Sequence, residues 1–181
     1  QGMLEDVEEQ INLVWPKEKI ITPDYVRGEH QNLSTAVTTS GWPLLDESRG
    51  KAIFVLLGGG DLREDYHSQF PNLEGATMFT MSVANTPEAA IFSNTNPVEE
   101  GDEIRALVEA GYIVRSRADS ADNGEADNNE TARRDAAIEV GAHTIVTDYP
   151  SQVDGIEYWV DLSVRCNPIS APLDCSDEDI E

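Results

Sequence analysis

The stretch "KAIFVLLGGG", residues 51–60, constrains the fold of this chain more than any other segment. It is continuously apolar from Ala52 to Leu57, and three glycines then stop it. A strand without polar alternation is buried on both faces, which is typical of a parallel sheet covered by helices. We therefore predict an α/β protein whose sheet is mainly parallel.

The remaining elements follow from apolar spacing and from turn residues. Further short strands are predicted at 76–82, 89–94, 111–117 and 142–150. Helical spacing or helix-start signals mark 4–15, 22–26, 33–41, 99–111 and 131–141. No interior linker indicates a second domain. We expect one domain over 1–165, followed by an irregular acidic tail over 166–181.

The charge of the chain restricts its partners. Thirty-five acidic residues face only 12 lysines and arginines, so the formal net charge is -23. Binding to phosphate backbones needs basic surface, so we expect no nucleic-acid partner. The same charge disfavours anionic lipid surfaces unless a divalent cation bridges the two, and its simplest explanation is solubility or adaptation to salt. No apolar run approaches the roughly 18 residues of a membrane span.

Two cysteines and two sequons bear on the compartment. Cys166 and Cys175 lie nine residues apart, and they form either a disulfide or two free thiols. N-glycosylation sequons at Asn32 and Asn129 weakly favour a secreted protein. No signal peptide is visible, but a mature secreted protein would already have lost it. Together these features favour an extracellular location.

Polar residues follow the strands at the ends where parallel α/β folds place functional groups. Two arginines among them suit an anionic group such as phosphate, because the guanidinium fork matches its oxygens. The alternative is a structural network in which Arg115 and Arg117 pair with Asp119 and Asp148, and the two interpretations carry about equal weight. The residues at these ends are Gly58, Gly59, Gly60 and Asp61; Ser93, Asn94 and Asn96; Arg115, Arg117 and Asp119; Thr147, Asp148 and Tyr149.

The loop "DSADNGEADNNE", residues 119–130, partly matches a calcium-binding loop. With Asp119 as position 1, the residues at positions 5, 6, 9 and 12 fit the EF-hand template. Position 3 is Ala121, and a strand precedes the loop where a helix is required. A solvated acidic loop is therefore the favoured interpretation. The glycines after Leu57 match neither phosphate-binding fingerprint and predict a tight turn.

The histidines indicate no acid–base pair. His30 and His67 are predicted in loops, and His143 at the start of the last strand. None stands at the carboxyl end of a strand, where the other polar groups gather. No Ser-His-Asp or Cys-His arrangement and no metal-ligand spacing is apparent.

Taken together, five collinear segments resemble the calcium-dependent phosphatidylinositol-specific phospholipase C family. They are "KIITPDYVRG", "GWPLLDESRGKAIFVL", "GYIVRSRAD", "TARRDAAIEVGAHTIVTDYP" and "RCNP", and the likeness runs from about residue 4 to about residue 168. The resemblance implies a TIM barrel that cleaves phosphatidylinositol to diacylglycerol and an inositol phosphate. It also implies two catalytic histidines and a Ca²⁺ ion.

The resemblance covers only the carboxyl-terminal part of that barrel, about strands five to eight with their helices. The family's histidine-asparagine strand and acidic metal ligands have no counterpart here. We therefore expect no catalytic residue in this chain, Ca²⁺ ligands mostly outside it, and a partner that is the missing amino-terminal half or another copy.

The resemblance also implies a binding site. Arg115, Arg117 and Asp119 match the family's "VRTRAD" motif, while Asp148 and Tyr149 match its last strand end. We predict that these five residues bind substrate. The alternatives are a phosphate- or inositol-binding module without catalysis, and a glycerophosphodiester phosphodiesterase, whose last strand is similar.

Overall fold

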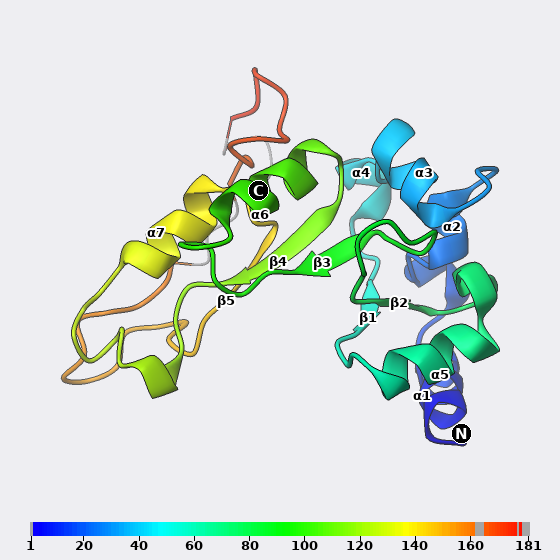
Figure 1. The fold of residues 1–181 in the computed structure, drawn as a ribbon, viewed down its shortest axis with the longest axis horizontal. Helices are drawn as coiled ribbons and strands as arrows, with labels where there is room; N and C mark the ends of the chain where they lie inside the picture. Colours follow the sequence, from blue (N-terminus) through cyan, green and yellow to red (C-terminus); the bar gives the residue numbers. More distant parts are fainter. Residues whose placement is uncertain (1, 162–164, 177, 179–181) are drawn as a thin grey trace. The chain divides into compact units, whose positions relative to one another are not determined.

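The computed structural model describes residues 2–161, 165–176 and 178, and the chain divides into two compact units (Figure 1). Unit 1 comprises residues 1–92, and unit 2 comprises residues 93–181. In unit 1 the helices are α1 (Gly2–Val14), α2 (Pro23–Arg27), α3 (Leu33–Thr39), α4 (Leu45–Ser48) and α5 (Asp61–Gln69), with 3₁₀ turns η1 (Lys17–Lys19) and η2 (Pro71–Leu73). Its strands are β1 (Phe54–Leu56) and β2 (Met78–Thr80), and β3 (Ile91–Ser93) crosses the unit boundary.

The sheet of unit 1 is parallel, as the apolar run predicts. β1 pairs with β2, with Phe54 opposite Met78. Single parallel bridges extend the pattern on both sides, from Ile20 to Ala52 and from Met81 to Ile91. Each pairing joins segments that follow one another along the chain, which is how successive β-α units build a parallel sheet.

Helix α1 packs through a different face from the one its apolar spacing indicates. Leu4 is buried, but Val7 and Val14 are 40% and 74% exposed. Glu8 is buried as well, and its carboxylate accepts hydrogen bonds from the backbone N–H groups of Thr77 and Met78. A buried carboxylate is tolerated when donors surround it, and periodicity alone cannot reveal those donors.

Helix α5 was not predicted, because its sequence "DLREDYHSQ" has one buried side chain, Tyr66. The prediction that His67 lies in a loop was therefore wrong. α5 packs beside α1 (Figure 1), and the Tyr66 hydroxyl donates a hydrogen bond to Glu8. Gly60 precedes the helix with φ at 56°, which explains the glycines after β1 as a turn.

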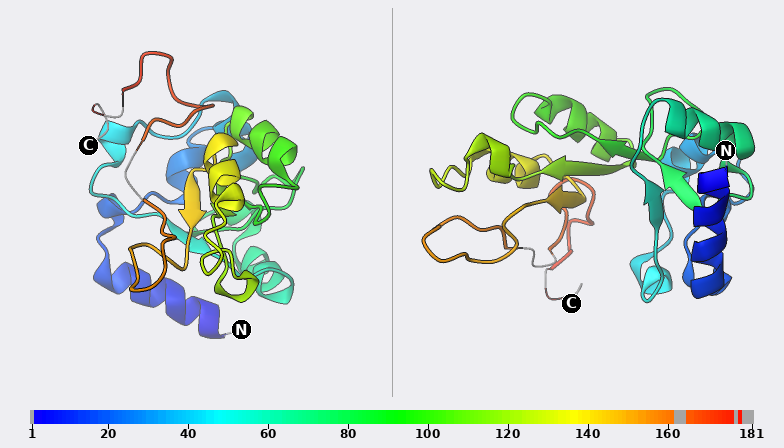
Figure 2. Two further views of the ribbon diagram at one scale, coloured as in Figure 1. Left: turned by 90° about the vertical axis from the view of Figure 1, so that its left-hand side faces the viewer. Right: turned by 90° about the horizontal axis from the view of Figure 1, so that it is seen from below.

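Unit 2 contains α6 (Gly101–Glu109), β4 (Ile113–Arg117), the 3₁₀ turn η3 (Ala121–Asn123), α7 (Ala132–Glu139) and β5 (Thr144–Val146). β4 and β5 are parallel, with Arg115 opposite Thr144, and the sheet order is β3-β4-β5. Both α6 and α7 contact β4; in the right-hand view of Figure 2, α6 lies above the strand and the orange segment after β5 lies below it.

The parallel α/β class is confirmed. The described residues form sheets of two and three strands and no closed barrel, so the TIM-barrel assignment stays a prediction. In the same residues no helix is long and apolar enough to cross a membrane.

Cys166 and Cys175 form a disulfide, so the free-thiol alternative is not the one observed. Beside it, the Asn167 amide donates to the Gly141 carbonyl at 2.7 Å. Gly141 has φ at 73°, and a Cβ there would lie 2.9 Å from the Asn167 side-chain oxygen. The tail is therefore fixed against the turn between α7 and β5, and that turn requires glycine.

Candidate functional site

The site is built on β4, where side chains alternate between two environments. Val114 and Ser116 are completely buried, while Ile113, Arg115 and Arg117 are partly exposed. Successive strand residues point to opposite faces, so Arg115 and Arg117 share the face away from the buried pair. The two-residue spacing of these arginines therefore places both on one face of β4, as the sequence predicts.

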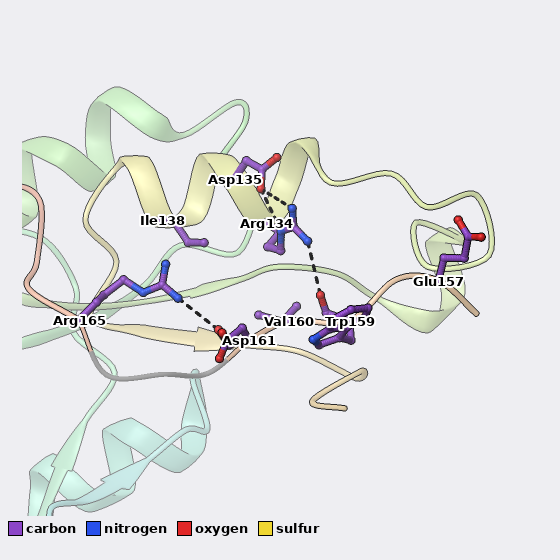
Figure 3. A pocket seen from close by; sticks show the side chains of 8 residues that line it. All are labelled: Arg134, Asp135, Ile138, Glu157, Trp159, Val160, Asp161 and Arg165. Carbon is purple, nitrogen blue, oxygen red and sulfur yellow. Dashed lines mark hydrogen bonds and ion pairs between the residues drawn. The ribbon is translucent and has the colours of Figure 1, made fainter. Parts of the chain in front are cut away.

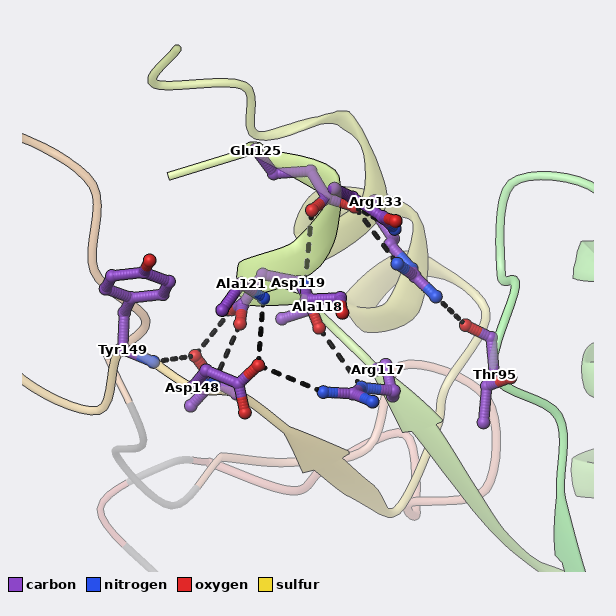
Figure 4. A network of polar contacts seen from close by, with 12 residues as sticks. Thr95, Arg117, Ala118, Asp119, Ala121, Glu125, Arg133, Asp148 and Tyr149 are labelled. Carbon is purple, nitrogen blue, oxygen red and sulfur yellow. Dashed lines mark hydrogen bonds and ion pairs between the residues drawn. The ribbon is translucent and has the colours of Figure 1, made fainter. Parts of the chain in front are cut away.

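Arg117 is held by groups from two loops (Figure 4). Its Nε donates to the backbone carbonyl of Asp119 at 3.1 Å. Its Nη2 forms an ion pair with Oδ2 of Asp148 at 3.2 Å. The same Asp148 oxygen accepts from the backbone N–H of Ala121 at 3.0 Å. Arg117 therefore has a fixed direction and a partner for its charge.

Asp119 does not share the exposure of the two arginines. β4 ends at Arg117, the chain turns, and the Asp119 side chain is completely buried. Its carboxylate accepts from the Thr147 hydroxyl at 2.5 Å, from the Asp148 backbone N–H at 2.7 Å and from the Tyr158 hydroxyl at 3.0 Å. Three donors compensate a carboxylate in the protein interior.

The end of β5 supplies the other predicted residues. Thr147 donates to Asp119, and its Oγ1 accepts from the Tyr149 backbone N–H at 2.9 Å. The Tyr149 ring packs edge-on against Tyr158, with ring centroids 5.9 Å apart. Tyr158 follows the last predicted strand, and sequence reasoning missed it. Its one available signal was a cluster of apolar and aromatic residues, "IEYWV", in an otherwise polar segment.

A second network joins the loop after β3 to the loop after β4. Arg133 of α7 forms an ion pair with Glu125 at 3.0 Å and donates to the Thr95 carbonyl at 2.6 Å. The other Glu125 oxygen accepts from the Ser120 backbone N–H at 3.2 Å. Figure 4 shows both networks, which together connect the strand-end loops of unit 2.

Arg115 differs from the other five arginines of unit 2. Arg117, Arg133 and Arg134 pair with carboxylates, and Arg105 and Arg165 donate to carbonyls. Among the residues described, Arg115 contacts only the neutral Ser93 hydroxyl, at 3.0 Å. Burial and the neighbouring positive charge of Arg117 lower the pKa of Arg115. An anion bound there would relieve this uncompensated charge.

A cavity of about 370 Å³ lies elsewhere in unit 2, between α7 and the segment around Trp159 (Figure 3). Its arginines already have partners. Arg134 is paired with Asp135 and donates to the Trp159 carbonyl, and Arg165 donates to the Asp161 carbonyl. This cavity is therefore a weaker candidate for anion binding than the Arg115 guanidinium is.

The other strand-end residues take structural positions. Asp61 begins α5 in unit 1, directly after Gly58, Gly59 and Gly60. In unit 2 the Asn94 backbone N–H donates to the Arg115 carbonyl, which places Ser93 and Asn94 beside β4. The Asn96 backbone N–H donates to Glu100 at the start of α6.

The histidines are engaged separately. His30 contacts Ser40, His67 contacts Thr80, and His143 Nδ1 accepts from the Val114 backbone N–H. In the described part of the chain, no three His, Cys, Asp or Glu residues are arranged to hold a metal ion. In the loop 119–130, Asp119 and Glu125 accept hydrogen bonds from protein groups, so the residues present do not fit an EF-hand Ca²⁺ site.

A comparison with protein families matches residues 1–168 to the model described as phosphoinositide phospholipase C, Ca²⁺-dependent. No curated protein and no solved structure matches the chain.

Proposed function

This chain belongs to the Ca²⁺-dependent phosphoinositide phospholipase C family, and on that basis we propose that it supplies the phosphate-binding part of a phosphodiesterase. The proposed reaction cleaves phosphatidylinositol to diacylglycerol and an inositol phosphate. Family membership indicates Ca²⁺ dependence and a phosphoinositide substrate.

The observation that carries the proposal is the charge arrangement on β4. Asp148 compensates Arg117, whereas Arg115 beside it has only a hydroxyl partner in the described structure. The pair therefore has an excess of one positive charge. A phosphodiester carries one negative charge, and a guanidinium fork binds two of its oxygens with good geometry.

In this proposal Arg115 binds the phosphate directly and Arg117 flanks it. Both stabilise negative charge that builds up on the phosphate oxygens while the bond to the diacylglycerol oxygen breaks. Asp148 and Tyr149 line the rim next to Arg117, and Asp119 supports them from the interior.

We propose that the acid–base groups and most Ca²⁺ ligands come from residues outside this chain. The motif likeness to strands five to eight of a TIM barrel supports this. The parallel pairings between successive strands in each unit are those that such a barrel would contain. The partner would be an amino-terminal half or another copy, which would cover unpaired strand edges. The disulfide is compatible with the secreted location that we propose.

Arg115→Gln tests the site directly. We expect the chain to bind inositol 1-phosphate, and the variant to bind it at least tenfold more weakly, because a charge-assisted hydrogen-bond pair is lost. Isothermal titration calorimetry measures both affinities. In the complete enzyme the same substitution should lower kcat/KM on phosphatidylinositol vesicles by orders of magnitude.

Arg105→Gln on α6 is the matched control, because it removes an equal charge from the same unit, and its affinity should equal that of the unsubstituted chain. An Arg115→Gln affinity that is also unchanged would assign Arg115 a structural role. Turnover by the complete enzyme that is insensitive to a Ca²⁺ chelator would exclude the calcium requirement.

A binding module without catalysis is the second candidate, favoured by the separate engagement of the three histidines. It predicts calorimetric binding of inositol phosphate without turnover by any form of the protein. A glycerophosphodiester phosphodiesterase predicts instead that glycerophosphoinositol is a better substrate than phosphatidylinositol vesicles.

A further inference from the structure

We propose that Tyr158 is a positioning residue of this site and that it fixes the direction of Arg117 through Asp119. The inference rests on the proposed function for its consequence in binding. The contacts that carry it lie entirely within unit 2.

Tyr158 is placed to donate to a buried carboxylate. Its side chain is 1% exposed and packs in a cluster with Ala118, Ala126 and Val160. Its hydroxyl lies 3.0 Å from Oδ2 of Asp119 and 3.2 Å from the Ala118 carbonyl oxygen. Both neighbours are acceptors, so the hydroxyl must act as the donor.

The ionisation behaviour of Tyr158 agrees with this geometry. Burial and the hydrogen bond to Asp119 both raise the pKa of the phenol. The hydroxyl therefore keeps its proton throughout the neutral pH range and remains a hydrogen-bond donor to Asp119.

Asp119 connects Tyr158 to the side chains of Arg117 and Asp148 at the ends of β4 and β5. Its carboxylate binds Tyr158 and Thr147 through one oxygen and the Asp148 backbone through the other. Its own carbonyl accepts from Nε of Arg117, and Asp148 binds the far end of the same guanidinium. The two contacts that direct Arg117 thus both depend on where Asp119 is held.

Packing alone does not explain the tyrosine. A phenylalanine would fill the same apolar cluster and make the same edge-on contact with Tyr149. It would leave Asp119 with one donor fewer in the interior, where an incompletely compensated carboxylate is costly. We expect the Asp119 peptide to reorient and the Arg117 side chain to lose its fixed direction.

Tyr158→Phe tests this with two measurements on the chain. In ¹⁵N NMR spectra, the Nε–H signal of Arg117 should be slowly exchanging in the unsubstituted chain and should exchange at least several-fold faster in the variant. In calorimetry with inositol 1-phosphate, the dissociation constant should rise several-fold. Val160→Ala, which loosens the same cluster but removes no polar group, should leave Arg117 exchange unchanged.

The two measurements separate the inference from the proposed function. If the unsubstituted chain binds no inositol phosphate, the proposed function fails, and Arg117 exchange still decides the inference. Unchanged exchange in Tyr158→Phe would overturn it, and so would equal acceleration in Val160→Ala. If Tyr158→Phe does not fold, Thr147→Val removes another donor to the same Asp119 oxygen and must accelerate Arg117 exchange for the inference to stand.

Discussion

Ser116 lies between the two arginines of β4 and points the opposite way. Its side chain is completely buried, and its hydroxyl has no hydrogen-bond partner in the described structure. A buried hydroxyl without a partner costs free energy that an alanine would avoid. Removing the hydroxyl oxygen of Ser116 should therefore stabilise the folded protein.

Ser116→Ala should raise the free energy of unfolding by about 0.5–1 kcal/mol, because it removes an unpaired buried polar group. Denaturant unfolding monitored by circular dichroism measures the change. Ser82→Ala is the contrasting control, since the Ser82 hydroxyl accepts from Ala90 and Ile91 and its loss should destabilise by about 1 kcal/mol. Equal destabilisation by both substitutions would show that Ser116 has a partner in solution.

Among the secondary-structure elements, α5 shows how polar contacts dock a helix with little apolar surface. Tyr66 bonds to Glu8 of α1, and His67 bonds to the buried Thr80 of β2 at 2.9 Å. Burial lowers the pKa of His67; Glu88 opposes this shift and Arg63 adds to it. The folded state therefore binds a proton at this site less readily than the unfolded chain.

That pKa gives a pH dependence with a definite sign. The unfolded histidine takes up a proton near pH 6.5, before the folded one does, so its contribution to stability is complete above pH 6.5 and is lost as the pH falls below it. Urea unfolding at pH 7.5 and pH 5.5 should show a larger loss of stability for the unsubstituted chain than for His67→Gln. Equal losses would mean that α5 docking does not depend on the neutral imidazole.

At the scale of the whole molecule, net charge affects how the small cationic site binds an anionic ligand. The net charge of -23 repels phosphate at long range, while Arg115 attracts it only at contact distance. Salt screens the first effect more than the second, because the Debye length falls from about 30 Å at 0.01 M to about 8 Å at 0.15 M.

Binding to phosphatidylinositol vesicles should therefore be stronger at 0.15 M than at 0.01 M NaCl, and millimolar Ca²⁺ should strengthen it further by bridging acidic groups. Sedimentation with vesicles measures the bound fraction. Neutral phosphatidylcholine vesicles are the control and should show little change. A steep loss of binding with salt, as a basic surface gives, would contradict this account.

The sequence by itself determined the parallel α/β class, the strand positions to within a few residues and the shared face of Arg115 and Arg117. These follow from local rules, since apolar runs and the two-residue period of a strand need no knowledge of distant residues. The family likeness likewise depends on collinear motifs.

Only the tertiary structure decided which polar groups are satisfied and by what. It placed Glu8 in the interior because backbone donors of residues 77 and 78 meet it there, and it buried Asp119 because Thr147, Asp148 and Tyr158 supply donors. It also left Arg115 with the neutral Ser93 hydroxyl as its side-chain partner in the described part of unit 2. These outcomes depend on contacts between residues 22 to 70 positions apart, and no local pattern encodes such contacts.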